Sequence, residues 1–348
     1  MSRTSDGHGP LASDRRARRS VTMVDVARAI GVSHQTVSRV LNGHPAVRPD
    51  TRARVLQALE SLGYRGNPAA RALVTRRSRT LGVVSFDSTL YGPASTLSGV
   101  EQAARSAGYF VSVVGLNRVT AGTVREAFDR LTSQDVEGIV IIAPLSGTAG
   151  AFAALDGDLP VVVVQGGEAP GLASVCVAQE EGARMVTQHL LERGAAAVWH
   201  LAGPATWVEA GGRIAGWRAG LREAGVAAPA VLRGDWRPSS GYAAGRRLAR
   251  RSDVEAVFVG NDQMALGLLR AFHEEGIRVP QDVLVAGFDD VPEAAYYTPP
   301  LTTVRQDFAA VGRLSVDVLL TQVGEDGQTG RHLTVAPELV VRQSTTRS

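Results

Sequence analysis

The chain lacks several features that define whole classes of proteins. Its 348 residues include a single cysteine, Cys176, so no intrachain disulfide can form. No run of 18 or more apolar residues occurs, which argues against a membrane-spanning helix. The first twenty residues are polar and Arg-rich, without the apolar stretch of a secretory signal. We therefore expect a cytoplasmic protein in which Cys176, within the apolar run 174–178, is a buried strand thiol.

Lysine is also absent, so all 37 basic residues are arginine, from which we infer nothing about function. Their distribution is informative. Residues 1–80 contain 15 Arg and 5 acidic residues, a balance of +10, whereas residues 81–348 contain 22 Arg and 29 acidic residues, a balance of −7. A basic first quarter on a mildly acidic body predicts a polyanionic partner for the N-terminal part of the chain.

The N-terminal quarter divides into three parts. Residues 1–20 have almost no apolar side chains and are expected to be a disordered basic tail, either contacting phosphates or simply solvated. Residues 21–64 read as three short helices: Thr22 and Asp25 form a capping-box pattern, Gly31 suits a helix end and Ser33 suits a helix start. Residues 65–79 read as a basic linker able to form one short helix.

From residue 80 onward short apolar runs alternate with amphipathic segments. This pattern predicts strands buried on both faces of parallel sheets, in doubly wound α/β units. About 270 residues are many for one sheet, so we expect two lobes. The expected strands are 81–86, 110–115, 138–143, 160–164, 198–202, 256–260 and 283–288, and the expected helices are 96–107, 124–133, 180–193, 213–224 and 263–275.

The second helix of the N-terminal unit has the side chains that read DNA. Its inner face is Val37 and Val40, which leaves Gln35 and Arg39, four residues apart, on one exposed face. Arginine makes bidentate hydrogen bonds to guanine, and glutamine makes them to adenine, in the major groove. The spacing therefore favours a helix-turn-helix DNA-binding unit. A short basic three-helix unit can also bind protein, and spacing alone leaves that alternative open.

The residues then match a known family. The stretch MVDVARAIGVSHQTVSRVLN at residues 23–42 closely resembles the headpiece of the LacI/GalR (lactose-repressor) family, as do Tyr64, Asn67 and Leu73 after it. The resemblance continues in order to about residue 345. Its further motifs are RIAGW (213–217), GDW (234–236), NDQMALG (261–267), GFDD (287–290) and PPLTTVRQDF (299–308).

This resemblance implies a set of DNA contacts. Residues 65–79 would contain a hinge helix that enters the minor groove, where Leu73 would wedge between base pairs rather than serve as a helix-packing leucine. The bases would be read by His34, Gln35 and Arg39; phosphates would be contacted by Thr22, Ser33, Thr36, Ser38 and Asn42; and the hinge would contribute Asn67, Ala70 and Leu73.

The resemblance also implies a periplasmic-binding-protein-like core, residues 80–348, with two lobes closing on a small sugar. The N lobe would comprise about 80–177 with 308–335, and the C lobe about 178–304 with 336–345. Asn261 would also cap a helix. The implied effector-binding residues are Arg213, Asn261 and Asp289 as hydrogen-bonding groups, Trp236 as a stacking ring, Gln306 and Phe308 at the lobe crossover, and Gln165 and Phe86 (or Tyr91) where the chain departs from the lactose repressor.

The predicted two-lobed core is compatible with three functions. The first is a dimeric, operator-binding and nucleoid-associated repressor of sugar-utilisation genes that its effector releases from DNA. The second, a transport solute-binding protein, conflicts with the basic headpiece and the missing secretory signal. The third, a sugar-processing enzyme, would have Asp262, Asp289 and Asp290 in its cleft, yet no nucleophile motif or metal-ligand cluster accompanies them. We therefore expect no catalytic residue, metal or cofactor. Because no heptad-bearing tail follows the last predicted strand, we expect a dimer rather than a tetramer.

Overall fold

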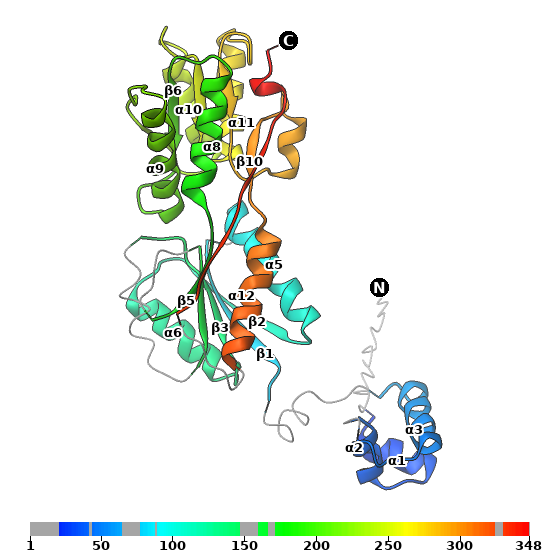
Figure 1. Cartoon of the computed structure of the whole chain (residues 1–348). Coiled ribbons are helices and arrows are strands. Elements are labelled where there is room, and N and C mark those ends of the chain that lie inside the picture. Colours follow the sequence, from blue (N-terminus) through cyan, green and yellow to red (C-terminus); the bar gives the residue numbers. More distant parts are fainter. Residues whose placement is uncertain are drawn as a thin grey trace, which may run out of the picture. The chain divides into compact units, whose positions relative to one another are not determined.

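The computed structural model describes residues 21–41, 44–64, 77–87, 89–146, 159–165, 171–323 and 330–347. The chain folds as two compact units, Met1–Ser78 and Arg79–Ser348 (Figure 1). Within the described ranges, none of the helices combines the length and the apolar character needed to cross a membrane.

The first unit is a three-helix headpiece of α1 (Met23–Ile30), α2 (His34–Leu41) and α3 (Pro49–Ser61). The Thr22 side chain caps α1 in a reciprocal capping box with Asp25, and Gly31 ends the helix in the left-handed conformation at φ 65°. The three helices share a small apolar core made of Val26, Ala27, Val37, Val40, Val55, Ala58 and Leu59.

The second unit contains two lobes with parallel sheets, which confirms the predicted fold class. In the N lobe the sheet order is β11-β5-β4-β3-β1-β2. Helices α5 and α12 pack together on one face of this sheet and α6 covers the other (Figure 1). The N-lobe elements are β1 (Thr80–Phe86), α5 (Tyr91–Ser106), β2 (Phe110–Leu116), α6 (Ala121–Thr132), β3 (Ile139–Ile142), β4 (Val161–Val164), β5 (Ala173–Val177), α12 (Phe308–Val323) and β11 (His332–Val335).

The C-lobe sheet has the order β7-β6-β8-β9. Helices α8 and α9 pack on one face around the buried Trp217, and α10 and α11 cover the other face. The C-lobe elements are α8 (Gln179–Glu192), β6 (Val198–Ala202), α9 (Val208–Glu223), β7 (Leu232–Arg233), α10 (Pro238–Leu248), β8 (Ala256–Val259), α11 (Asp262–Glu274), β9 (Leu284–Ala286), η1 (Pro292–Tyr296) and η2 (Gln343–Thr345).

Three segments connect the lobes. The chain passes from β5 to α8, returns from β10 (Thr303–Arg305) to α12, and passes again from β11 to β12 (Glu338–Val340) (Figure 1). Strands β10 and β12 pair antiparallel. Asp290 ties these crossovers together, since its two oxygens accept hydrogen bonds from Arg305 (2.7 Å) and Arg342 (2.6 Å).

Cys176 is less buried than predicted. Its neighbours on β5, Val175 and Val177, are buried, but Cys176 is only half-buried. Its sulfur lies 3.9 Å from the hydroxyl of Thr334 on β11. Val175 and Val177 belong to the core on the face covered by α5 and α12, so Cys176 between them points to the opposite face of the sheet, where its side chain is less covered.

Candidate functional site

The exposed face of α2 presents the predicted base-reading residues. Val37 and Val40 are buried, whereas His34, Gln35 and Arg39 are exposed. The helix therefore packs one face on the headpiece core. Its other face carries three side chains that can make hydrogen bonds. This face therefore has the arrangement required for major-groove recognition.

The predicted phosphate-contacting residues gather at helix starts. The Ser33 hydroxyl accepts a hydrogen bond from the Thr36 amide at 3.1 Å, and Thr22 caps α1. Helix N-termini carry unpaired amides that favour phosphate. Ser38 is half-buried on α2. Four other predicted contacts, Asn42, Asn67, Ala70 and Leu73, lie outside the described residues.

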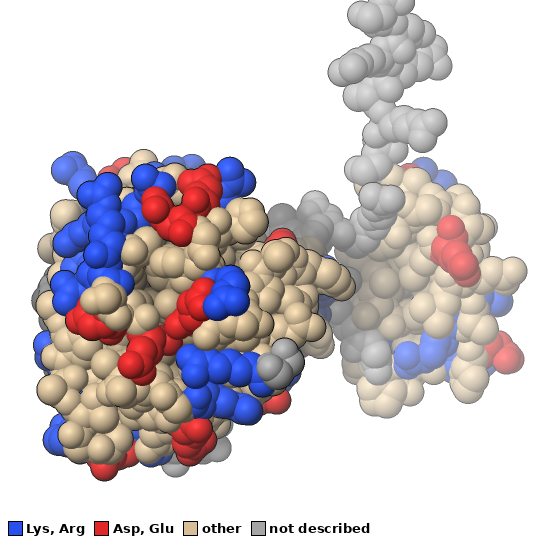
Figure 2. Space-filling view, turned by 90° about the horizontal axis from the view of Figure 1, so that it is seen from above, with Lys and Arg blue, Asp and Glu red and all other residues tan. Residues whose placement is uncertain are grey.

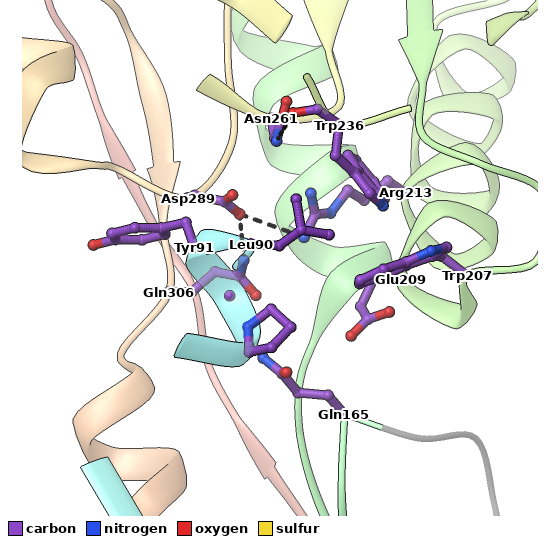
Figure 3. Close-up of a pocket in the computed structure, with 12 residues that line it drawn as sticks. Leu90, Tyr91, Gln165, Trp207, Glu209, Arg213, Trp236, Asn261, Asp289 and Gln306 are labelled. Atoms are coloured by element: carbon purple, nitrogen blue, oxygen red, sulfur yellow. Dashed lines mark hydrogen bonds and ion pairs between the residues drawn. The ribbon is translucent and has the colours of Figure 1, made fainter. Parts of the chain in front are cut away.

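A cavity lies in the core unit where the N lobe meets the C lobe (Figure 3). It encloses about 390 Å³ when all the space between its atoms is counted, part of which is open to solvent, and this is at the lower end for ligand pockets. Six of the eight predicted effector-binding residues line it: Gln165, Arg213, Trp236, Asn261, Asp289 and Gln306.

The other two predicted residues do not line the cavity. The ring of Phe86 lies 6.2 Å from that of Trp207, and the ring of Phe308 lies 5.8 Å from that of Tyr91. Trp207 and Tyr91 are themselves lining residues, so Phe86 and Phe308 support the wall from behind. Of the two aromatic residues considered near residue 90, Tyr91 is the one at the cavity.

Several lining residues were not predicted from the sequence. Among them are the aromatic Trp207 and the acidic Glu209. Both lie at the start of α9, directly after β6, where the carboxyl end of a parallel strand opens into a crevice. That position was a usable signal. The remaining unpredicted lining residues are Leu90, Gly92 and Pro93.

Arg213 is held in place by several contacts. Its guanidinium donates to Gln179 Oε1 (2.9 Å) and to the Gly260 carbonyl oxygen, and it lies 3.5 Å from the Asp289 carboxylate. It also lies 4.0 Å from the centre of the Phe288 ring. Because its donors are occupied in this way, Arg213 is a fixed part of the cavity wall and not a free cation.

A chain of side-chain amides extends from this arginine. Gln179 Nε2 donates to Gln306 Oε1 (2.7 Å), and Gln306 Nε2 donates to Asp289 Oδ1 (2.6 Å). On the other wall Asn261 caps α11 by accepting from the Met264 amide at 2.9 Å, as expected, while its amide donates to the Trp236 carbonyl oxygen. Capping orients the Asn261 side chain toward the cavity wall without consuming all of its hydrogen-bonding capacity.

Three buried polar atoms of the cavity have no hydrogen-bond partner within the described structure. They are Gln165 Oε1, Glu209 Oε2 and Trp236 Nε1. Buried polar groups are almost always satisfied, and leaving one unsatisfied costs about 1–3 kcal/mol. Their gathering at one cavity indicates a site for a molecule that supplies both donors and acceptors.

Comparison with known proteins identifies both parts of the chain. The family model of bacterial regulatory proteins of the lacI family matches residues 22–67, and a periplasmic binding protein-like domain matches residues 187–345. The lactose operon repressor of Escherichia coli (strain K12) is 35% identical over 328 residues, covering 94% of this chain and 91% of the relative. The chain belongs to the lacI family of bacterial regulatory proteins. The predicted class, a DNA-binding transcriptional regulator with a two-lobed binding core, is thereby confirmed.

Solved structures of the lacI family superpose over most of the chain. A Lac repressor dimer bound to operator and the anti-inducer ONPF has a TM-score of 0.85 at 34% identity, covering 94% of this chain and 100% of that one. A complex of the transcriptional regulator CelR with cellobiose has a TM-score of 0.70 at 30% identity, covering 93% and 99%.

Burial changes the acid–base behaviour of the cavity of this lacI-family protein. Desolvation raises the pKa of Glu209 to about 8, and it raises the pKa of Asp289 to about 6 despite the neighbouring charge of Arg213. Near neutral pH the cavity therefore holds an uncharged carboxylic acid at Glu209 and an ionised carboxylate, paired with Arg213, at Asp289.

The backbone of the cavity is strained at three lining residues. Gln165, Trp236 and Asp289 have φ values of 59°, 71° and 112°, in the region that favours glycine. Such conformations cost about 1–3 kcal/mol each and cluster at functional sites. Each of the three follows closely after a strand, so the strain aims these side chains into the crevice.

Backbone hydrogen bonds join the two lobes beside the cavity. The Val208 amide donates to the Pro144 carbonyl oxygen (2.9 Å), and the Ser146 amide donates to the Thr206 carbonyl oxygen (2.8 Å). Leu145 and Trp207 form the β-bridge between them. The loop after β3 thus contacts the start of α9, which fixes Trp207 and Glu209 relative to the N lobe.

The described residues contain no group of three or more His, Cys, Asp or Glu side chains that could hold a metal ion. Acidic and basic side chains are interspersed on the C-lobe end of the core (Figure 2). Several of them are paired, as Arg270 is with Glu274 (2.6 Å) and Arg251 with Asp253 (2.8 Å). Part of the positive charge on this surface is therefore neutralised by neighbouring acidic groups.

Proposed function

We propose that this protein is a homodimeric transcriptional repressor that binds a pseudo-palindromic operator and is released from it by a small sugar. The exposed His34, Gln35 and Arg39 would read bases in the major groove. The cavity lined by Arg213 and Asp289 would bind the effector. Operator and sugar-like ligands are bound by the Lac repressor structure, and cellobiose by CelR.

The observation that carries the sugar assignment is the set of three unpartnered atoms. Gln165 Oε1 needs a donor and Trp236 Nε1 needs an acceptor, and Glu209 Oε2 also lacks a partner. A sugar hydroxyl both donates and accepts, and the aromatic faces of Trp207 and Trp236 suit the apolar face of a sugar ring.

Release of the repressor from its operator would follow from a change in the relative orientation of the two lobes. A ligand shifts an equilibrium only by its different affinities for the two states. The cavity touches both lobes, so a bound sugar favours one lobe arrangement over the other. The headpieces would follow through the hinge segment 65–79, with the lobe boundaries at the three crossovers. We place the protein in the cytoplasm, at its operator, and assign it no enzymatic activity.

The test combines DNA selection with effector screening. Selection from a random DNA library should enrich one operator with two half-sites, as a dimer requires. Fluorescence anisotropy on that operator should then show release by at least one mono- or disaccharide that also raises the melting temperature. Enrichment of no sequence would contradict the repressor assignment, whereas an operator that no sugar releases would contradict the effector class alone.

A further inference from the structure

Glu209 is a buried acid of which one carboxyl oxygen has no partner. It lies in the first turn of α9 and is 7% exposed, and its Oε2 atom has no partner within the described structure. Arg213 follows one helical turn later, but its guanidinium is already bonded to Gln179, Gly260 and Asp289. The obvious counter-ion of Glu209 is therefore engaged elsewhere.

A carboxyl group in such a place is stable only when it is uncharged, because an unpaired buried charge is very costly. The groups that face it are few. Burial raises the pKa of Glu209, a hydrogen bond from its own backbone and the charge of Arg213 lower it, and Asp289 after β9 raises it. Burial dominates and brings the pKa to about 8. Tyr91 of α5 also lines the cavity, but its hydroxyl points away from it and bonds Ser95 (Figure 3).

Building on the effector role proposed above, we propose that Glu209 is a specificity-determining residue: as an uncharged acid it donates a hydrogen bond to an oxygen of the effector, which selects neutral carbohydrates over charged ones. No bond is made or broken, and the proton stays on Glu209 throughout. This role is absent from the residues that the family resemblance brought forward.

The groups around Glu209 explain why a neutral effector would be preferred over a charged one. Among the described lining residues Arg213 is the one cation, and it is already paired with Asp289, so a carboxylate or phosphate on the effector would have to compete for it. An amine on the effector would be buried against an acid that prefers to remain uncharged. A hydroxyl meets neither penalty, since it can accept from Glu209 and donate to Gln165 Oε1.

The position of Glu209 also links it to closure. The residue before it, Val208, donates its amide hydrogen bond to Pro144 of the N lobe. When the lobes separate, this bond is lost and the first turn of α9 loses its support. The hydrogen bond from Glu209 to the effector therefore adds to the binding free energy only when the lobes are closed. An effector needs such a difference in affinity to shift the equilibrium between the two lobe arrangements.

The experiment measures operator release by anisotropy, and sugar binding by intrinsic tryptophan fluorescence, at pH 7 and pH 9. The probes are cellobiose, lactose and glucose as neutral sugars, with cellobionate, glucose 6-phosphate and glucosamine as charged counterparts. The proteins are the native chain, Glu209→Gln, Glu209→Ala and the control Glu223→Gln. Glu223 lies on the same helix in an exposed pair with Arg184.

We expect a neutral sugar to act on the native protein at a lower concentration than its charged counterpart. The concentration for half-release should rise about tenfold from pH 7 to pH 9, as an acid with a pKa of about 8 ionises. Glu209→Gln should remove this pH dependence and retain the response at pH 7, whereas Glu209→Ala should weaken the response at both pH values. Glu223→Gln should behave as the native protein does.

The proposal fails if Glu209→Ala responds like the native protein, if a charged probe acts at least as well as its neutral counterpart, or if none of the neutral sugars binds. It also fails if the pH dependence persists in Glu209→Gln. Operator affinity is measured first for every protein. Loss of operator binding in the native chain would instead overturn the repressor assignment, which separates the two failures.

Discussion

At the residue scale, the cavity contains buried polar atoms without hydrogen-bond partners, and these atoms lower the stability of the native state. Glu209, Gln165 and Trp236 each bury an atom without a partner, and the last two also adopt positive φ. A ligand that satisfies these atoms recovers their desolvation cost. The free energy of unfolding is therefore expected to respond strongly to ligand and, through Glu209, to pH.

Glu209→Gln should make the stability of the protein less dependent on pH. The pKa of Glu209 is raised in the folded state, so its stabilising contribution is complete below about pH 4.5 and is lost as the pH rises through about 8. The variant should thus gain stability relative to the native chain over this interval, by as much as about 5 kcal/mol. Chemical denaturation at pH 5, 7 and 9 measures the difference. A constant difference across these pH values would show that Glu209 does not titrate as the structure implies.

Arg39→Ala should weaken specific operator binding by about 1–3 kcal/mol and relax the preference at one base position. The side chain is exposed on α2, so its loss should not disturb the headpiece core of Val37 and Val40. Quantitative selection or footprinting measures the preference. Arg28→Ala is the control, because this residue is exposed on α1 beside Asp25. Equal base preference in the Arg39 variant and the native chain would remove Arg39 from the reading face.

At the scale of elements, close helix packing holds the wall of the C lobe. Helices α10 and α11 approach each other at glycines: a Cβ atom added at Gly267 would overlap the carbonyl oxygen of Pro238, and one at Gly241 would overlap that of Met264. Asn261, which lines the cavity, caps α11, so the packing of these helices fixes part of the site.

Gly267→Ala should therefore destabilise the C lobe by about 1–3 kcal/mol, since backbone atoms must move to admit the methyl group. Gly211→Ala is the matched control. It lies within α9 with open space around it, and alanine there should stabilise the helix by about 0.5–1 kcal/mol. Thermal or chemical unfolding measures both. Equal stability of the two variants would contradict the packing of α10 on α11.

Sequence patterns predicted the elements unevenly. The apolar runs that became β1, β3, β4, β6, β8 and β9 were visible because these parallel strands are buried on both faces. The apolar run of β2 was also visible, but the expected burial on both faces is wrong for it, since β2 is an edge strand whose residues are exposed or half-buried. The short strands β7, β10 and β12 were not visible, since two or three residues carry no periodicity. Six lining residues followed from the family resemblance. Trp207 and Glu209 lie outside those motifs. Their place after β6 pointed to the crevice, but the bridge between Trp207 and Leu145 that fixes this segment forms only in the folded chain.

At the scale of the whole molecule, the proposed dimer needs a surface to form it. Several apolar side chains of the core are exposed: Phe110 and Val113 lie on the edge strand β2, Leu266 on α11 and Tyr296, 87% exposed, on η1. Two linked headpieces bind two half-sites far more tightly than one headpiece binds one. Dimer formation and operator affinity should therefore change together.

Leu266→Arg should weaken dimer formation and lower operator affinity at least tenfold, while leaving the melting of the core nearly unchanged because Leu266 is 43% exposed. Ala243→Arg, at an exposed position on the neighbouring helix α10, introduces the same charge as a control. Sedimentation velocity and anisotropy measure the two effects. A Leu266 variant that remains dimeric would exclude this side chain from the interface.

The last described segment of the chain completes both lobes. Strand β11 adds the edge of the N-lobe sheet, and a few residues later Ser344 bonds to the Val285 carbonyl oxygen (2.6 Å) and the Thr302 amide (2.8 Å) in the C lobe. The N lobe lacks its edge strand until residue 335 has left the ribosome, and the C lobe lacks its last contacts until residue 345 has done so. The helices of the headpiece are complete within the first 64 residues. During translation each nascent chain thus carries a folded DNA reader well before it has a sensor to control it.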